Sequence, residues 1–159
     1  MKEQLLKELE YFFAGDARRI EHAKKVLNFS EELLLTERAD RNIVIPASIL
    51  HDVGIKIAEL KYASSAGHYQ EIEGPPVARA ILSRMAFDEK NITEICQIIA
   101  HHHSPGEIDT LNFKVLYDAD WLVNLRDEID TTDKSKVRAM IDKIFLTETG
   151  KNIARRLYL

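Results

Sequence analysis

The sequence has little of what disulfide-rich, secreted or membrane-spanning proteins need. Its single cysteine, Cys96, excludes an intramolecular disulfide, and the apolar stretch 92–100 around it predicts burial as a small hydrophobic side chain. No apolar run is long enough to cross a bilayer, and the first residues lack the apolar core of a signal peptide. These absences predict a cytoplasmic protein without a membrane partner.

Basic charge is not in excess either. The 22 lysine and arginine residues are outnumbered by 26 aspartate and glutamate residues, which gives a net charge of −4. Binding to a nucleic-acid backbone favours the opposite balance, so a nucleic-acid polymer is not an expected partner. What is present is ordinary for a globular protein, with 45% apolar and 30% charged residues. A chain of 159 residues can bury a core without disulfides, and we expect one domain over residues 1–159.

Apolar residues recur at helical spacing through most of the chain, and no strand-like alternation is longer than residues 42–45. The pattern therefore predicts an all-α fold, a single-domain helical bundle. Expected helices cover approximately residues 5–13, 17–37, 47–53, 77–85, 89–102, 112–126, 134–145 and 151–157. Asp16 and Asp88 are suitable N-caps. Pro46 suits the first turn of the third helix, Gly54 suits its end, and the segment 74–76 (Gly-Pro-Pro) is expected to interrupt the chain before the fourth.

Four residues form a candidate ligand set for a divalent metal. His51 and Asp52 are adjacent within the apolar segment 49–54, where an ionised carboxylate needs a partner to offset its lost hydration. His22 shares an apolar stripe with residues at spacings of four, seven and eleven, so it faces inward. With Asp120 they supply two imidazoles and two carboxylates. The alternatives are a satisfied core histidine at 22 and a helix-end carboxylate at 52 beside a surface histidine.

A run of three histidines and a pair of acidic residues are further candidates for a metal site. His102 shares a helical face with isoleucines, so it is expected to point to the same interior as His22; alternatively the run complements a helix dipole. Asp118 and Asp120 lie in an apolar helical stretch, where unpaired acids are costly. One can bind a metal while the other orients a histidine. An ion pair with Arg126 or Lys114 is the alternative for Asp118.

Taken in order, these motifs resemble a known signature. His22, then His51-Asp52 within Leu-His-Asp-Val-Gly, then Asp120 within Asp-Ala-Asp-Trp-Leu, resemble the H…HD…D pattern of the HD-domain superfamily. Residues 72–82 also resemble the helix that lies between the second and third elements of that family. The resemblance covers about residues 19–124, with further C-terminal helices within 134–157, and it implies a helical bundle of the HD type.

The resemblance also implies an activity, that of a metal-dependent phosphohydrolase. The expected substrate is a nucleotide or another small phosphate ester, and the expected cofactor is one divalent ion of Mn, Fe, Co, Ni, Zn or Mg. Such an ion activates a water and polarises a phosphoryl oxygen. By this resemblance the ligands are His22, His51, Asp52 and Asp120. Two further side chains are the expected catalytic groups: Asp118, orienting a ligand or accepting a proton, and Lys56, offsetting phosphoryl charge.

A second metal is an open question at this point. In binuclear relatives, histidines before the last motif hold it, and His101 and His102 stand there; Glu71 is a further oxygen donor. These three residues could instead bind the substrate phosphate. Such relatives also carry a histidine four residues before the middle glycine, where this chain has Gln70. The alternatives are a di-iron oxygenase and a non-catalytic nucleotide- or protein-binding module. His68, His103 and the oligomeric state carry no assignment.

Overall fold

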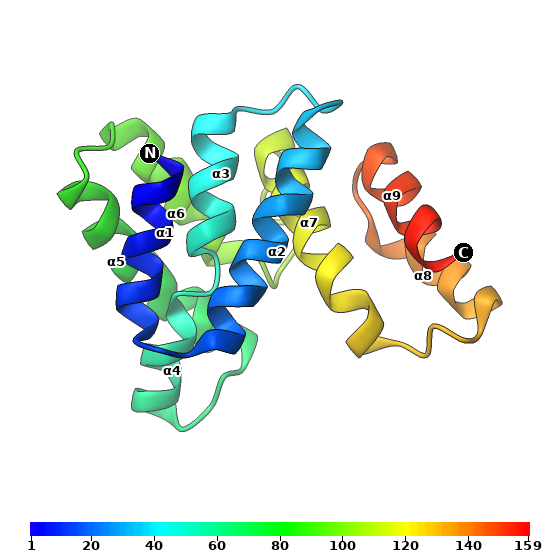
Figure 1. Cartoon of the computed structure of the whole chain (residues 1–159), viewed down its shortest axis with the longest axis horizontal. Coiled ribbons are helices and arrows are strands. Elements are labelled where there is room, and N and C mark those ends of the chain that lie inside the picture. The colour runs from blue at the N-terminus through cyan, green and yellow to red at the C-terminus, as the bar shows by residue number, and fades with distance from the viewer.

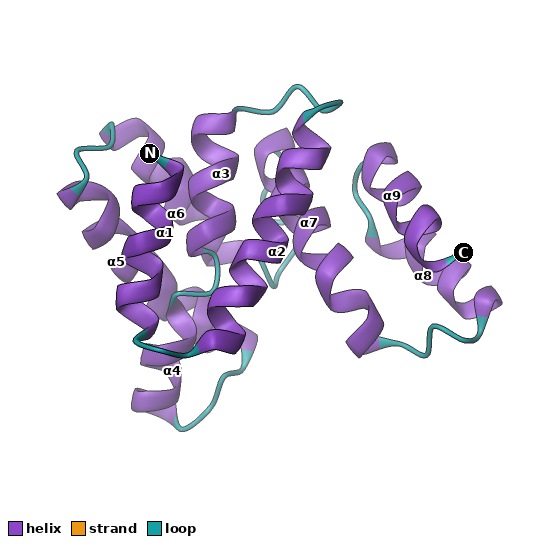
Figure 2. Cartoon of the chain, in the orientation of Figure 1, coloured by secondary structure: helices purple, strands orange, loops and turns teal.

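The computed structural model describes residues 1–159, which form nine α-helices and no strand (Figures 1 and 2). The all-α prediction is confirmed. No helix combines the length and the apolar character that a membrane crossing requires. The helices are α1 (Lys2–Phe13), α2 (Ala17–Leu34), α3 (Arg41–Leu50), α4 (Gly54–Tyr62), α5 (Gly67–Arg84), α6 (Glu89–His101), α7 (Leu111–Glu128), α8 (Lys134–Ile144) and α9 (Glu148–Tyr158).

Helix α3 is the centre of the bundle. Every residue from Ile43 to Leu50 is buried, and α3 contacts α1, α2, α6 and α7. Helix α1 covers this core with Leu5 and Leu9, both fully buried, so its apolar face is satisfied within the chain. Cys96 on α6 is buried, as predicted. Because the helices around α3 bring their inner faces together, residues far apart in sequence can meet at its C-terminal end.

The C-terminal pair α8 and α9 packs beside α7, away from α1 and α5 (Figure 1). Helix α9 contacts both α7 and α8. The Tyr158 hydroxyl donates a hydrogen bond to the backbone oxygen of Leu122 (3.0 Å), and Lys134 binds the backbone oxygen of Tyr158 (2.7 Å). The end of α9 is thereby fixed against α7.

The expected start of the third helix at Pro46 is wrong. Helix α3 begins at Arg41, and the side chain of Asp40 caps it by accepting a hydrogen bond from the backbone nitrogen of Asn42 (2.8 Å). Pro46 lies inside the helix and is buried. Its missing N–H leaves the carbonyl of Asn42 without the usual helical donor, a local cost that the burial of the surrounding apolar residues offsets.

Gly54, expected to end a helix, and Gly74, expected to interrupt the chain before one, serve close packing instead. Gly54 begins α4, which the sequence did not predict, and α5 runs through Gly74, Pro75 and Pro76 without a break. A Cβ added to Gly54 would lie 2.7 Å from the backbone nitrogen of Gly74 and would collide with the backbone oxygen of Gln70. The small residues therefore let the backbones of α4 and α5 approach, and this tertiary packing outweighs the local tendency to interrupt a helix.

Candidate metal centre

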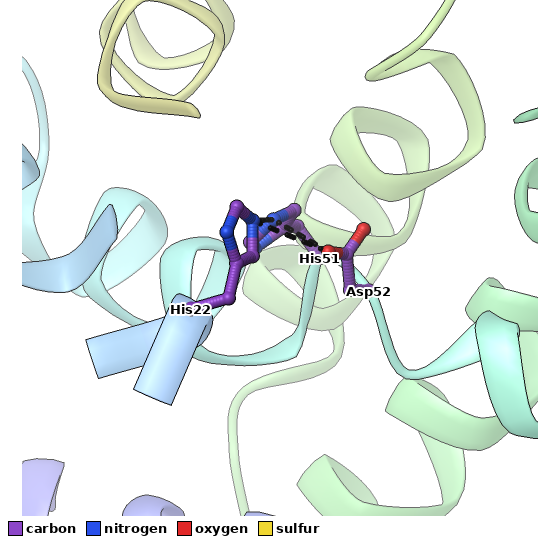
Figure 3. Close-up of side chains that lie close together, drawn as sticks. All are labelled: His22, His51 and Asp52. Carbon is purple, nitrogen blue, oxygen red and sulfur yellow. Dashed lines mark hydrogen bonds and ion pairs between the residues drawn. The ribbon is translucent and has the colours of Figure 1, made fainter. Parts of the chain in front are cut away.

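Three structural elements bring His22, His51, Asp52 and Asp120, here called the His/Asp cluster, to one place. His22 comes from α2, Asp120 from α7, and the adjacent pair from the turn between α3 and α4. Because α3 ends at Leu50, both members of the pair can reach the same point beyond the helix end. Figure 3 shows the side chains of three of these residues, His22, His51 and Asp52, converging on one another.

The ligand atoms of His22, His51 and Asp52 lie within 4.8 Å of one another, close enough to bind one metal ion. Asp120 Oδ1 contacts both histidines. His22 Nε2 lies 3.3 Å from His51 Nε2, 3.3 Å from Asp52 Oδ2 and 3.1 Å from Asp120 Oδ1. His51 Nε2 lies 3.3 Å from Asp52 Oδ2 and 3.4 Å from Asp120 Oδ1. Donor atoms bound at ~2.0–2.2 Å to one ion lie roughly 2.8–3.6 Å apart, the shorter distances in octahedral and the longer in tetrahedral geometry. The donor set and its spacing therefore fit a divalent metal.

Hydrogen bonds outside the cluster orient two of its members. The Nδ1 atom of the fully buried His51 lies 2.8 Å from the backbone oxygen of Ser48, which can only accept, so Nδ1 carries a proton. In the neutral ring this leaves a lone pair on Nε2, directed at the other ligand atoms. Asn124 donates to Asp120 Oδ1 (3.0 Å). Such partners fix ring and carboxylate orientation in metal sites.

The electrostatics of the cluster favour a positive charge at its centre. Burial lowers the pKa of His51, but the carboxylates of Asp52 and Asp120 outweigh it and hold this pKa well above its usual value. Burial raises the pKa of both carboxyl groups, and here the histidines outweigh it and hold both below their usual range. A proton on His51 and a metal ion thus compete for the same pair of carboxylates.

Beside the cluster lies a second group of candidate ligands, Asp52, His102 and His103, whose ligand atoms are all within 4.8 Å of one another. His102 Nε2 is 3.3 Å from Asp52 Oδ1, and its Nδ1 is 2.7 Å from the backbone oxygen of Ile99. His102 therefore points into the same interior as His22, as predicted. His101, at the end of α6, belongs to neither group of candidate ligands and does not line the cavity over the cluster, so the structure does not bring it to the site.

His103 carries no role in the sequence analysis, and its hydrogen bond with Gln70 explains how it joins this group. The Gln70 amide nitrogen donates to the backbone oxygen of Ser65 (2.6 Å), so its oxygen faces His103 Nε2 at 3.0 Å. His103 Nε2 must then carry the proton, which leaves the lone pair on Nδ1. Burial lowers the pKa of His103 to about 4, so the ring is neutral near pH 7. Glu71 instead accepts hydrogen bonds from the backbone of His103 and from Ser104.

Neither expected catalytic side chain reaches the cluster. Asp118 is fully buried, and its carboxylate accepts hydrogen bonds from the backbone nitrogens of Leu146 and Thr147 and from the Thr147 hydroxyl. These donors occupy it without Arg126 or Lys114. Lys56 donates to the backbone oxygen of Phe12 (2.8 Å) and lies over the Phe12 ring. Both side chains are committed to packing between helices, and a role at the site is not supported for either.

A cavity of 770 Å³ opens over the His/Asp cluster. His22, Asp52 and Asp120 form part of its wall, with Gln70 and His103 also lining it. Helices α2, α7 and α9 supply most of the rest, including four basic side chains and an apolar surface. These further lining residues include Arg18, Arg19, Lys25, Arg126, Phe29, Leu122, Val123 and Leu157. The cluster is thus accessible from a pocket large enough for a small organic substrate.

Comparison with known proteins agrees with this geometry. The family model described as HD domain matches residues 19–125. The chain belongs to the HD-domain family. A solved structure, described as a predicted HD superfamily hydrolase from an uncultured Thermotogales bacterium, is 26% identical, with a TM-score of 0.73 over 98% of this chain and 84% of that one. No curated protein matches the chain. This membership places the protein in a superfamily of metal-dependent hydrolases, and the cluster is where a metal could bind.

Proposed function

We propose that this HD-domain protein is a metal-dependent phosphohydrolase acting on a small phosphate ester, with a nucleotide as the first class to test. The observation that carries the proposal is the convergence of two histidine nitrogens and two carboxylates within 3.1–3.4 Å contacts at the wall of an open cavity. Family membership supports the hydrolytic class. The cationic side chains on the cavity wall can contact an anionic substrate.

Different residues of the site have different roles in the proposed reaction. In the proposal His22, His51, Asp52 and Asp120 hold one divalent ion, which supplies an activated water and an electrophile for a phosphoryl oxygen. Ser48 and Asn124 keep His51 and Asp120 oriented through their hydrogen bonds. His102 and His103, which form the second group of candidate ligands with Asp52, face the substrate or a second ion. Cationic side chains in the cavity offset the charge on the phosphoryl oxygens.

Metal content and phosphate release together test this proposal. Protein purified without chelator is expected to carry about one equivalent or more of a transition metal and to lose it in Asp52→Ala. The wild type should release phosphate from nucleotides or p-nitrophenyl phosphate with added Mn, Co or Ni. Asp109→Ala, which removes an exposed acid outside the cavity lining, is the matched control. A wild type that binds no metal after reconstitution contradicts the proposal and leaves a helical binding module.

The second group of candidate ligands is the basis for proposing a second metal ion. Asp52, His102 and His103 could hold a second, more weakly bound ion that shares Asp52 with the first. Two iron ions at full occupancy would favour the di-iron oxygenase alternative, since that chemistry needs a complete second site. Metal identity in the purified protein therefore distinguishes hydrolysis from oxidation before any substrate is known.

A further inference from the structure

Three basic side chains around the cavity, Arg18, Lys25 and Arg126, here called the outer cations, have no carboxylate within ion-pairing distance. All three are exposed. Most other basic side chains near them are engaged: Arg19 pairs with Asp16 (3.2 Å) and Glu59, and Lys24 pairs with Glu10 (3.1 Å). Unpaired cations that line a cavity are available to a ligand, whereas paired ones are not.

The outer cations are placed beside the His/Asp cluster and not within it. Arg18 lies four residues before His22 on α2, and Lys25 lies three residues after it. At 1.5 Å rise per residue these offsets are about 6 and 4.5 Å along the helix, and both fall within roughly 60° of His22 around its axis. Arg126 faces the same cavity from α7. A phosphate held at the cluster therefore has positive charge one helical turn away on either side.

We propose that the substrate carries a second phosphoryl group, bound by Arg18, Lys25 and Arg126 while the first lies at the His/Asp cluster. This inference rests on the proposed phosphohydrolase function and narrows its substrate class to compounds with two separated phosphates. A metal ion of charge +2 with two carboxylate ligands is neutral overall, so it does not by itself favour a second anion. The outer cations supply that preference through charge-assisted hydrogen bonds.

Two acidic side chains set a limit on how much charge the cavity accepts. Glu21 and Asp127 also line it, and neither forms an ion pair with the outer cations. The three outer cations exceed these two acids by a single positive charge. An anion that spreads over the whole opening is therefore repelled by the acids as well as attracted by the cations. Removing one acid should therefore strengthen binding of the second phosphate, the opposite of removing a cation.

A matched pair of ligands tests the inference on the metal-loaded full-length protein. Propyl phosphate and propane-1,3-diyl bisphosphate share the alkyl chain and the ester bond and differ in the second phosphate. By isothermal titration at physiological salt, the wild type is expected to bind the bisphosphate at least about fivefold more tightly. Lys25→Ala or Arg126→Ala should reduce this ratio severalfold with little change for propyl phosphate, and Asp127→Asn should increase it.

Lys24→Ala is the control, because it removes the same charge from the neighbouring position but from a side chain paired with Glu10 outside the cavity. Its affinity ratio should match the wild type. A wild-type ratio near one overturns the inference while leaving the proposed function intact. Equal weakening of both ligands in Lys25→Ala and Arg126→Ala also overturns it, because the cations then serve the reacting phosphate. If the metal-loaded protein binds neither ligand, the proposed function fails together with the inference.

Discussion

Asp118 Oδ2 accepts two hydrogen bonds from Thr147, one from its backbone nitrogen (2.9 Å) and one from its hydroxyl (2.7 Å). Thr147 is the N-cap of α9, and its hydroxyl oxygen in turn accepts from the backbone nitrogen of Gly150 (2.9 Å). Asp118 therefore connects α7 to the first turn of α9. Although it lies only two residues from Asp120, the buried Asp118 carboxylate holds the C-terminal helices against α7.

Asp118→Asn should lower stability and spare the metal site. The amide nitrogen replaces one acceptor oxygen and faces donors, which leaves a buried N–H or hydroxyl unpaired. We expect the free energy of unfolding to fall by about 1–3 kcal/mol, measured by urea denaturation at pH 7.5. Metal content should match the wild type, as in the exposed control Asp109→Asn. Loss of metal at unchanged stability would instead restore a role for Asp118 at the site.

Gly54→Ala tests the close approach of α4 and α5. The added Cβ would lie 2.7 Å from the backbone nitrogen of Gly74 and would also meet the backbone of Gln70, and neither can move without shifting a helix. We expect a loss of about 1–3 kcal/mol, with weaker metal binding because Asp52 is two residues away.

Gly74→Ala is the comparison for this variant. There the new Cβ would meet the side-chain Cγ2 of Ile99 at 2.7 Å, and a side-chain end can adjust more readily than a backbone. Thermal denaturation should rank the wild type first, Gly74→Ala second and Gly54→Ala last. A Gly54→Ala protein as stable as the wild type would show that the two backbones have room to separate.

The sequence predicted the His/Asp cluster because its chemistry is conspicuous locally. An acid beside a histidine in an apolar segment needs a partner wherever it lies, and helical spacing already turns His22 inward. The same local reasoning failed at residues 74–76, where glycine and proline usually end a helix. It failed because the deciding interaction is the packing of Gly74 against Gly54, which joins two helices. Such a contact cannot be predicted from the sequence of either segment alone.

The supporting residues of the site were harder to predict for a related reason. Asp118 and Asp120 are about 200° apart around α7, so only one can face the cluster, and the partner of the other, Thr147, lies 29 residues away in sequence. Likewise, which of the three histidines at 101–103 reach the site depends on the direction that the chain takes after α6. His103 joins through Gln70, the residue whose presence had weakened the expectation of a second metal.

The neighbouring histidines 101 and 103 should behave differently in metal binding. Titration of the metal-free protein with Mn(II), followed by electron paramagnetic resonance, is expected to show a tighter and a weaker site. His103→Ala should remove the weaker site, because it takes one ligand from the group with Asp52 and His102. His101→Ala removes the same ring from a position outside that group and should keep both sites. Identical behaviour of the two variants contradicts the assignment of His103.

Metal affinity should rise with pH because the metal displaces a proton from the cluster. The carboxylates of Asp52 and Asp120 hold the pKa of His51 well above its usual value against the opposing effect of burial, so the metal-free cluster favours the protonated ring. Both carboxyl groups have lowered pKa values and stay ionised. Below the raised pKa each pH unit should strengthen binding up to about tenfold, with a plateau above it. Calorimetry in two buffers of different ionisation enthalpy measures the released proton directly, and a binding enthalpy independent of buffer would contradict this competition.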